Sequence, residues 1–252
     1  MIYTSTDSGE SWKIIMNRLE YSRFDWNIPY MKPSYNGGGN CVHWISDIKF
    51  SPFDSDTALF NTGTGLFMIT GLASGDVLVK PFCEGIEETV HLNVYTTPHG
   101  RNRIIDIIGD LGGFAFEDYD SECENSFANE NGDRYITCLN ADLTLSDPEY
   151  IVATPRGNWT GKTKGGLILS KDCGSTWERL SMPRGLSEFI DQKLDNIEKP
   201  NVDSGWTAIS ADGKRIMWAV AGGRGFSNKA VCYTDDEGKT WQKSIFTDSN
   251  GN

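Results

Sequence analysis

The pattern [ST]-x-D-x-G-x-[ST]-W occurs three times in this chain of 252 residues, over residues 5–12, 170–177 and 234–241. Each copy follows a short apolar segment. We expect a β-hairpin turn at each copy, in which the aspartate accepts backbone N–H bonds, the glycine adopts a positive φ and the tryptophan packs against the hairpin base. This interpretation of the motif, an Asp-box, makes its three aspartates structural: Asp7, Asp172 and Asp236.

The spacing of the three copies predicts a β-propeller, because the second and third are separated by the length of one long four-stranded blade. Short apolar segments joined by Asp-rich turns fill the intervals, as around residues 45–60, 135–153 and 206–219. We therefore predict an all-β fold made of four-stranded antiparallel blades with Asp-box hairpins, about four to five of them. The one segment with a helical pattern is residues 186–194.

Composition narrows the choice of partners. The formal net charge of -12 makes nucleic acid and anionic membrane surfaces unfavourable partners. Aromatic residues make up 12% of the chain, with 8 Trp, which favours a neutral polar ligand such as a sugar. No apolar run is long enough to span a membrane, and the opening residues 1–7 resemble structure more than a signal peptide.

The six cysteines form no C-x-x-C pair, and the three histidines show no metal-ligand spacing, so we expect neither a zinc site nor any other cofactor. Buried thiols and up to three disulfides both remain open from the sequence. His91, on an alternating strand, and His99, in a turn, are expected to be structural.

The segment from Gly85 to Glu117 predicts a strand, a turn, a strand, a tight turn and a third strand. Asp110 stands where the second strand ends, and Gly112 and Gly113 follow it. One interpretation places this carboxylate at the mouth of a site, with open space left by the glycines. The other is that Asp110 caps its turn by bonding backbone N–H groups, and spacing alone favours this second interpretation.

Three segments together resemble glycoside hydrolase family 74: residues 45–65, 85–94 and 109–114, the last two with the sequences GIEETVHLNV and GDLGGF. The resemblance extends over most of residues 1–245. It implies two seven-bladed propellers in tandem, a substrate cleft between them and one catalytic aspartate on each. Residues 1–252 would then form a partial β-propeller domain, the front part of the second, C-terminal propeller, and Asp110 would match the catalytic aspartate of that propeller.

The resemblance implies a secreted enzyme that cleaves the β-1,4-glucan backbone of xyloglucan by an inverting mechanism with two carboxylates. Asp110 would act as general acid, and a first propeller that is missing here would supply the base. Other acidic residues are weaker candidates. We expect Asp106 to bond backbone and Asp118 to lie on a solvated loop, and Asp47 is a further acidic neighbour.

Candidate sugar-binding residues are aromatics in predicted loops, because loops on a rigid scaffold commonly carry recognition. For Trp44, packing between blades is an equally good interpretation. The candidates, with the two glycines beside Asp110, are Trp26, Tyr30, Tyr35, Trp44, Gly112, Gly113 and Trp159.

The main alternative is a non-catalytic carbohydrate-binding remnant of a propeller, since no second carboxylate of the same kind is evident. A sialidase also uses Asp-boxes but needs an arginine cluster, and the ten arginines here are scattered. A sortilin-like propeller would end in a Cys-rich module that the sequence lacks. An incomplete ring would also leave an open sheet edge, which predicts poor solubility without a partner segment.

Overall fold

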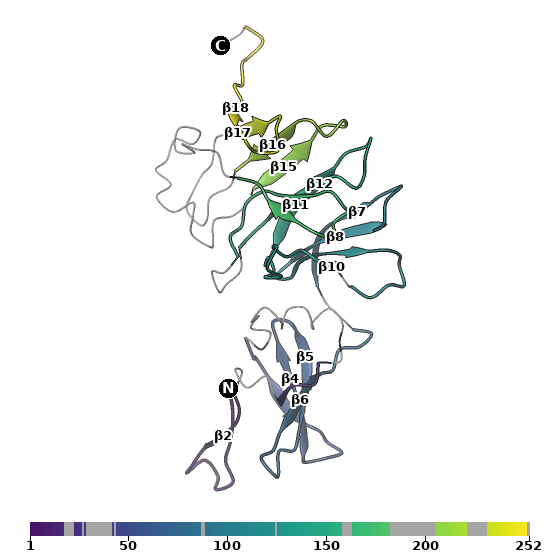
Figure 1. The fold of residues 1–252 in the computed structure, drawn as a ribbon. Helices are drawn as coiled ribbons and strands as arrows, with labels where there is room; N and C mark the ends of the chain where they lie inside the picture. The colour runs from purple at the N-terminus through teal and green to yellow at the C-terminus, as the bar shows by residue number, and fades with distance from the viewer. Residues whose placement is uncertain are drawn as a thin grey trace. The chain divides into compact units, whose positions relative to one another are not determined.

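The computed structural model describes residues 1–17, 23–26, 28, 42, 44–86, 89–123, 125–157, 163–181, 205–220 and 231–250 (Figure 1). Every element in these residues is a β-strand, and every sheet is antiparallel. The chain divides into two compact units, Met1–Thr89 and Val90–Asn252, and each is described by itself.

The first unit contains a hairpin and one four-stranded sheet. The hairpin strands β1 (Ile2–Thr4) and β2 (Lys13–Met16) are joined by the first Asp-box. The sheet consists, in spatial and chain order, of β3 (Ile48–Phe50), β4 (Thr57–Thr62), β5 (Gly65–Thr70) and β6 (Leu78–Pro81). Its core forms where apolar residues alternate along the central strands, with Phe60 of β4 stacked on Phe67 of β5 at 5.5 Å.

The second unit contains three four-stranded sheets, again with strands in chain order. The first is β7 (Val90–Thr96), β8 (Ile104–Gly109), β9 (Gly112–Phe116) and β10 (Asn125–Ser126). The second is β11 (Cys138–Leu143), β12 (Ile151–Pro155), β13 (Ile168–Ser170) and β14 (Glu178–Arg179). The third is β15 (Trp206–Ile209), β16 (Ile216–Ala219), β17 (Val231–Thr234) and β18 (Gln242–Lys243).

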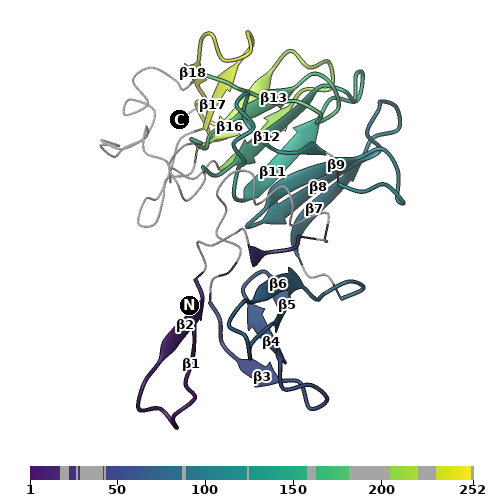
Figure 2. The same cartoon turned by 60° about the horizontal axis from the view of Figure 1, so that its bottom comes forward.

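These three sheets stack face to face in chain order, as Figure 2 shows from teal to yellow. Side chains alternate between the two faces of each strand, so one sheet serves two cores. Ile151 and Ala153 of β12 pack in the core shared with β8, and Val152 between them packs in the core shared with β16. Face-to-face stacking of four-stranded sheets is the architecture of propeller blades, so the predicted fold class is confirmed.

The first strands of the three blades run in the same direction. Asn140 Oδ1 of β11 accepts the N–H of Thr207, and Asp142 Oδ2 accepts the N–H of Ile209, so β11 and β15 advance together. The residue before β11 also lies beside the start of β9, where Gly112 forms a parallel bridge with Thr137. The unit therefore has two rims, at opposite ends of the strands.

We call the end where β7, β11 and β15 begin the Asp110 rim, because the turn from β8 to β9 lies there. The other end is the Asp-box rim, which carries the turns at 144–150 and 210–215 and the second and third Asp-boxes. The assignment of residues 1–252 to a partial C-terminal propeller stays a prediction, and the possible helix at 186–194 lies outside the described residues.

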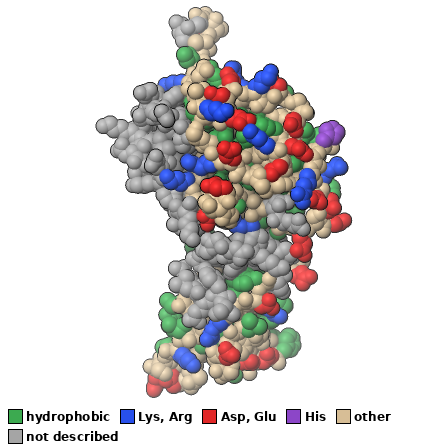
Figure 3. Space-filling view, viewed as in Figure 1, with side chains coloured by type: hydrophobic (Ala, Val, Ile, Leu, Met, Phe, Trp, Pro, Cys, Tyr) green, Lys and Arg blue, Asp and Glu red, His purple; other side chains and the backbone are tan. Residues whose placement is uncertain are grey.

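On the face of the second unit seen in Figure 3, acidic and basic side chains are interspersed. The described residues contain no helix that is long and apolar enough to cross a membrane. Three cysteines of this unit are buried free thiols: Cys138, Cys173 and Cys232. The six cysteines of the chain therefore do not form three disulfides. Burial raises the pKa of Cys138 and of Cys232 to about 12.

Candidate functional site

The Asp-box carboxylates bond within their own turns. Asp172 Oδ1 accepts the N–H of Thr176 at 2.8 Å, and its Oδ2 accepts the hydroxyl of the same residue at 2.6 Å. Asp236 makes the same two bonds with Thr240. Hydrogen bonds, first of all from the Thr240 hydroxyl, lower the pKa of Asp236 to about 2. A carboxylate held in this way stabilises its hairpin, and its lowered pKa makes it a poor general acid.

Asp110 is bonded differently. It lies in the two-residue turn between β8 and β9 with a left-handed φ of 63°, and its N–H donates to Thr137 Oγ1 at 3.0 Å. Its side chain is exposed, and among the described residues no hydrogen bond or ion pair engages the carboxylate. The turn-capping interpretation, which spacing alone favoured, therefore does not describe Asp110. Its carboxylate is presented to solvent at the Asp110 rim by a turn that the next blade holds.

The two glycines after Asp110 do not leave open space, which corrects the expectation from the sequence. Both are buried. A Cβ on Gly112 would lie 2.8 Å from the carbonyl oxygen of Tyr135, and one on Gly113 would lie 2.8 Å from the ring of Phe127. Gly112 and Gly113 thus allow β9 to approach neighbouring protein segments closely, and no room remains there for a ligand.

Asp106 also differs from expectation. It is 6% exposed on β8, and its carboxylate pairs with Nδ1 of His91 at 2.8 Å instead of bonding backbone. A buried carboxylate needs such a partner because an unpaired buried charge is unfavourable. Asp118 does lie on an exposed loop, where its Oδ1 accepts the N–H of Asp120. Asp47, in the other unit, is exposed and pairs with Lys49.

The candidate sugar-binding aromatics are found in different settings. Trp26 stacks on Phe24 at 4.8 Å and packs against the core of the first unit. Trp44 is 80% exposed in the same unit, and both interpretations of it, sugar binding and packing between blades, stay predictions. Tyr30, Tyr35 and Trp159 lie outside the described residues.

The described residues that precede Trp159 in the sequence end at the Asp110 rim. The last described residues before it follow β12, and there the N–H of Arg156 donates to the carbonyl of Thr137 at 2.7 Å. Thr137 is the residue whose hydroxyl holds the Asp110 turn. Thr137 thus contacts both the candidate catalytic turn and Arg156 at the end of β12.

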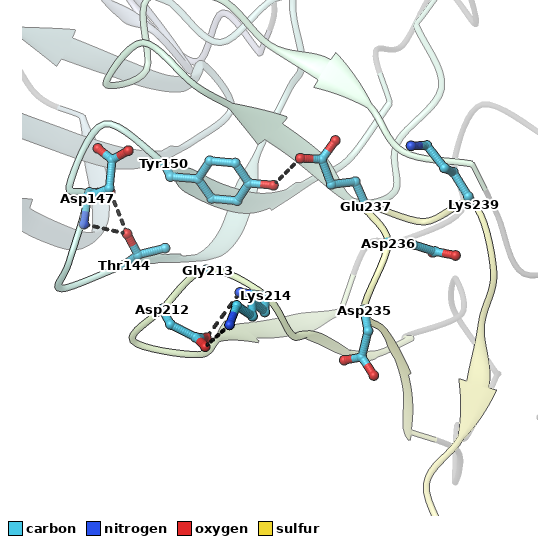
Figure 4. A pocket seen from close by; sticks show the side chains of 10 residues that line it. All are labelled: Thr144, Asp147, Tyr150, Asp212, Gly213, Lys214, Asp235, Asp236, Glu237 and Lys239. Carbon is cyan, nitrogen blue, oxygen red and sulfur yellow. Dashed lines mark hydrogen bonds and ion pairs between the residues drawn. The ribbon is translucent and has the colours of Figure 1, made fainter.

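A pocket of about 430 Å³ lies on the other rim, between the second and third blades of the unit (Figure 4). Its lining residues are Thr144, Asp147, Tyr150, Asp212, Gly213, Lys214, Asp235, Asp236, Glu237 and Lys239. Across it the Tyr150 hydroxyl donates to Glu237 at 2.7 Å, and burial together with this carboxylate raises the pKa of Tyr150.

The acidic groups around this pocket are engaged with the protein itself. Glu237 also pairs with Lys171, and Asp235 accepts two bonds from the guanidinium of Arg215 at 2.7 and 2.8 Å. No set of three or more ligating side chains among the described residues could hold a metal ion. The bonds from Tyr150 and Lys171 to Glu237 join the two blades here, and the pocket is separated from Asp110 by the length of the strands.

Comparison with known proteins decides which propellers these blades resemble. The chain matches a Paenibacillus xyloglucanase at 25% identity over 97% of its own length and 23% of the relative's, and a xyloglucanase of Acetivibrio thermocellus at 25% over 96% and 27%. An oligoxyloglucan-reducing end-specific xyloglucanase of Emericella nidulans is 27% identical over 87% of this chain and 30% of the relative. No family model matches the chain.

Solved structures of similar fold are also GH74 enzymes. The GH74 xyloglucanase from Xanthomonas campestris superposes with a TM-score of 0.68 and 22% identity, over 95% of this chain and 30% of that one. The GH74 enzyme of Niastella koreensis gives a TM-score of 0.62 at 20% identity, over 96% and 29%. The chain has the propeller fold of glycoside hydrolase family 74. It spans about a quarter of the length of the curated relatives it matches.

Two residues of the Asp110 rim were not singled out from the sequence. Thr137 stands alone before a strand and belongs to no motif. Its bond to Asp110 forms only because the two blades lie side by side in the structure. Trp206, in the segment S-G-W-T, was assigned only to a strand, and the structure shows it to be 64% exposed.

Proposed function

We propose that this chain is part of a glycoside hydrolase that cleaves the β-1,4-glucan backbone of xyloglucan. The observation that carries the proposal is the match to xyloglucanases over 87–97% of the chain. The exposed carboxylate of Asp110, which no described residue engages, supports it. The three Asp-box aspartates are poorer candidates for the catalytic residue, because the carboxylate of each is bonded within its own turn.

In the proposed mechanism Asp110 acts as the general acid and protonates the glycosidic oxygen of the leaving glucan. A second carboxylate, about 6.5–9.5 Å away across the bond, removes a proton from water on the opposite face, and the anomeric configuration inverts. Asp106 is a poor candidate for this base, because it is buried and its carboxylate is paired with His91. We therefore infer that the base comes from a first propeller of the same kind, and that the enzyme acts outside the cell, where its polysaccharide substrate lies.

A second candidate function is carbohydrate binding without hydrolysis. It is favoured by one observation: Asp106, the acidic residue closest to Asp110 in the sequence, is buried and paired with His91, so it does not offer a second free carboxylate. A propeller that binds glucan through its rim, without a partner base, would fit this arrangement equally well.

The test measures reducing-sugar release from xyloglucan by the chain alone and by the chain mixed with the first propeller of the Paenibacillus relative. We expect hydrolysis that depends on Asp110, lost in Asp110→Asn and retained in Asp118→Asn, an exposed aspartate on the Asp-box rim. Hydrolysis that survives Asp110→Asn would contradict the assigned role. Binding without hydrolysis in every mixture would favour the non-catalytic alternative.

A further inference from the structure

The turn that carries Asp110 is the shortest connection between the second and third strands of a blade in this unit. Asp110 and Leu111 alone join β8 to β9, whereas residues 156–167 join β12 to β13 and residues 220–230 join β16 to β17. The φ of Asp110 is 63°, an unfavourable value for a residue with a side chain, so contacts from outside the turn must stabilise it. The direction of the carboxylate therefore depends on what holds this backbone.

Residues 135–137 of the following blade, which we call the anchoring segment, hold the turn at two points. The N–H of Asp110 donates to Thr137 Oγ1 at 3.0 Å. The N–H of Gly112 donates to the carbonyl of Ile136, and Gly112 forms a parallel bridge with Thr137. Of these contacts, only the bond to Asp110 is made by a side chain, so it is the one that a substitution can remove.

The anchoring segment is itself fixed on its other side, by the end of β12. The N–H of Arg156 donates to the carbonyl of Thr137 at 2.7 Å, and the N–H of Ile136 donates to the carbonyl of Arg156 at 3.3 Å. Thr137 is 9% exposed, so water competes little for its hydroxyl. Thr137 thus offers the turn an acceptor whose position is set by its own blade.

These bonds also determine which donors the Asp110 carboxylate can use. In the third Asp-box the N–H of Thr240 donates to the carboxylate of Asp236 and holds it within its turn. In the turn of Asp110 the N–H groups of Asp110 and Gly112 donate to the anchoring segment instead. These two donors therefore do not draw the Asp110 carboxylate back into its own turn.

We propose that Thr137 is a positioning residue for Asp110: its hydroxyl fixes the backbone of the turn and so directs the carboxylate towards the glycosidic oxygen. Thr137 acts through the backbone of Asp110 and not on the substrate. A general acid must lie within hydrogen-bond reach of the oxygen that it protonates, and a displacement of about 1 Å can slow a reaction about 100-fold. The catalytic consequence rests on the proposed function, whereas the effect of Thr137 on the turn does not.

The test compares two buried threonines, each of which accepts the N–H of a turn, on opposite rims of the unit. Thr137→Val removes the acceptor for the Asp110 N–H, and Thr137→Ser retains it. Thr144→Val is the matched control, because Thr144 is 1% exposed at the end of β11 and its Oγ1 accepts the N–H of Asp147 at 3.0 Å on the Asp-box rim. Thermal unfolding shows whether each variant folds. Thr137→Ala removes the same acceptor without a second methyl group and replaces Thr137→Val if that variant does not fold.

The first readout is kcat and KM for xyloglucan, in whichever preparation of the hydrolysis test is active. We expect Thr137→Val to lower kcat by about tenfold or more while KM changes less than about twofold, because ground-state binding does not need the acid. Thr137→Ser and Thr144→Val should keep the original kcat. An unchanged kcat in Thr137→Val, or equal losses of kcat in the two valine variants, would overturn the proposal.

The second readout needs no hydrolysis. The ¹³C chemical shifts of Asp110 depend on its φ and ψ, and NMR spectroscopy of the whole chain measures them. We expect these shifts to move in Thr137→Val and to stay at the original values in Thr137→Ser and Thr144→Val. Unchanged Asp110 shifts in Thr137→Val would show that Thr137 does not fix the turn.

The catalytic assignment and the positioning role can fail separately. If no preparation cleaves xyloglucan but the Asp110 shifts respond to Thr137→Val alone, the proposed function falls and the control of the turn by Thr137 remains. If cleavage depends on Asp110 but Thr137→Val cleaves as the original chain does, the positioning role falls and the catalytic assignment remains.

Discussion

The backbone N–H of Asp110 donates to the hydroxyl oxygen of Thr137, 3.0 Å away, across the boundary between two blades. Asp110 has a φ of 63°, a conformation that is unfavourable for a residue with a side chain by roughly 1–2 kcal/mol. One hydrogen bond of this kind contributes about 1 kcal/mol, so the bond from Asp110 to Thr137 offsets much of that strain. The candidate catalytic turn is thus held in place by the neighbouring blade.

Replacing Thr137 with valine should loosen this turn. Thr137→Val keeps the shape of the side chain but removes the acceptor for the Asp110 N–H, and we expect the free energy of unfolding to fall by about 1 kcal/mol. Thr137→Ser retains the hydroxyl and serves as the control. Urea denaturation measures the difference, and amide hydrogen exchange at Asp110 should quicken only in the valine variant. Equal stability of the two variants would show that the bond is not formed.

Gly113 should not tolerate a methyl group. A Cβ there would lie 2.7 Å from the carbonyl oxygen of Asp106 and 2.8 Å from the Phe127 ring, so Gly113→Ala overpacks the contact and should destabilise by about 1–3 kcal/mol. Gly132 has a φ of 77° but nothing near its Cβ position, so Gly132→Ala measures backbone strain alone. We expect the larger loss in Gly113→Ala by denaturant titration. A smaller loss there would argue against the close approach of β9 to Phe127.

The third Asp-box should make the protein sensitive to acid. The pKa of Asp236 is lowered from 3.8 to about 2 in the folded state, chiefly by the Thr240 hydroxyl. A lowered pKa means that the folded state binds the proton less tightly than the unfolded state. The stabilisation is therefore complete above pH 3.8 and is lost as the pH falls towards 2.

Asp236→Asn removes this titrating group, so the denaturation midpoint of the variant should vary less with pH than that of the original chain over the same interval. Asp120→Asn, a change at an exposed loop aspartate, is the control and should leave the pH dependence unchanged. The measurement is urea denaturation at a series of pH values. A variant with the original slope would show that the Asp236 carboxylate is not held as the structure places it.

Local patterns in the sequence predicted the repeating parts of this fold. Each Asp-box needs only residues within eight positions of one another, so its hairpin and the bonds of Asp172 follow from the motif itself. The alternation of apolar residues likewise predicted the strands, because the two faces of a strand repeat every two residues. The resemblance to family 74 directed attention to Asp110.

What the motif at 109–114 could not show is how its residues meet other blades. The two glycines were expected to open a space and instead allow contact with Tyr135 and Phe127. Asp106 found its partner in His91 on the neighbouring strand. These outcomes depend on which segments lie opposite each residue, and that is a property of the sheet register.

The sequence by itself determined the class of fold, the position of its Asp-box turns and the residue most similar to a catalytic acid, since these depend on short-range bonding and on motif identity. Only the tertiary structure decided that Asp110 leaves its carboxylate unengaged, that Thr137 holds its turn and that Trp206 stands exposed on the same rim. The physical reason is that hydrogen bonds and burial between blades join residues far apart in the chain, and neither spacing nor composition encodes which of them meet.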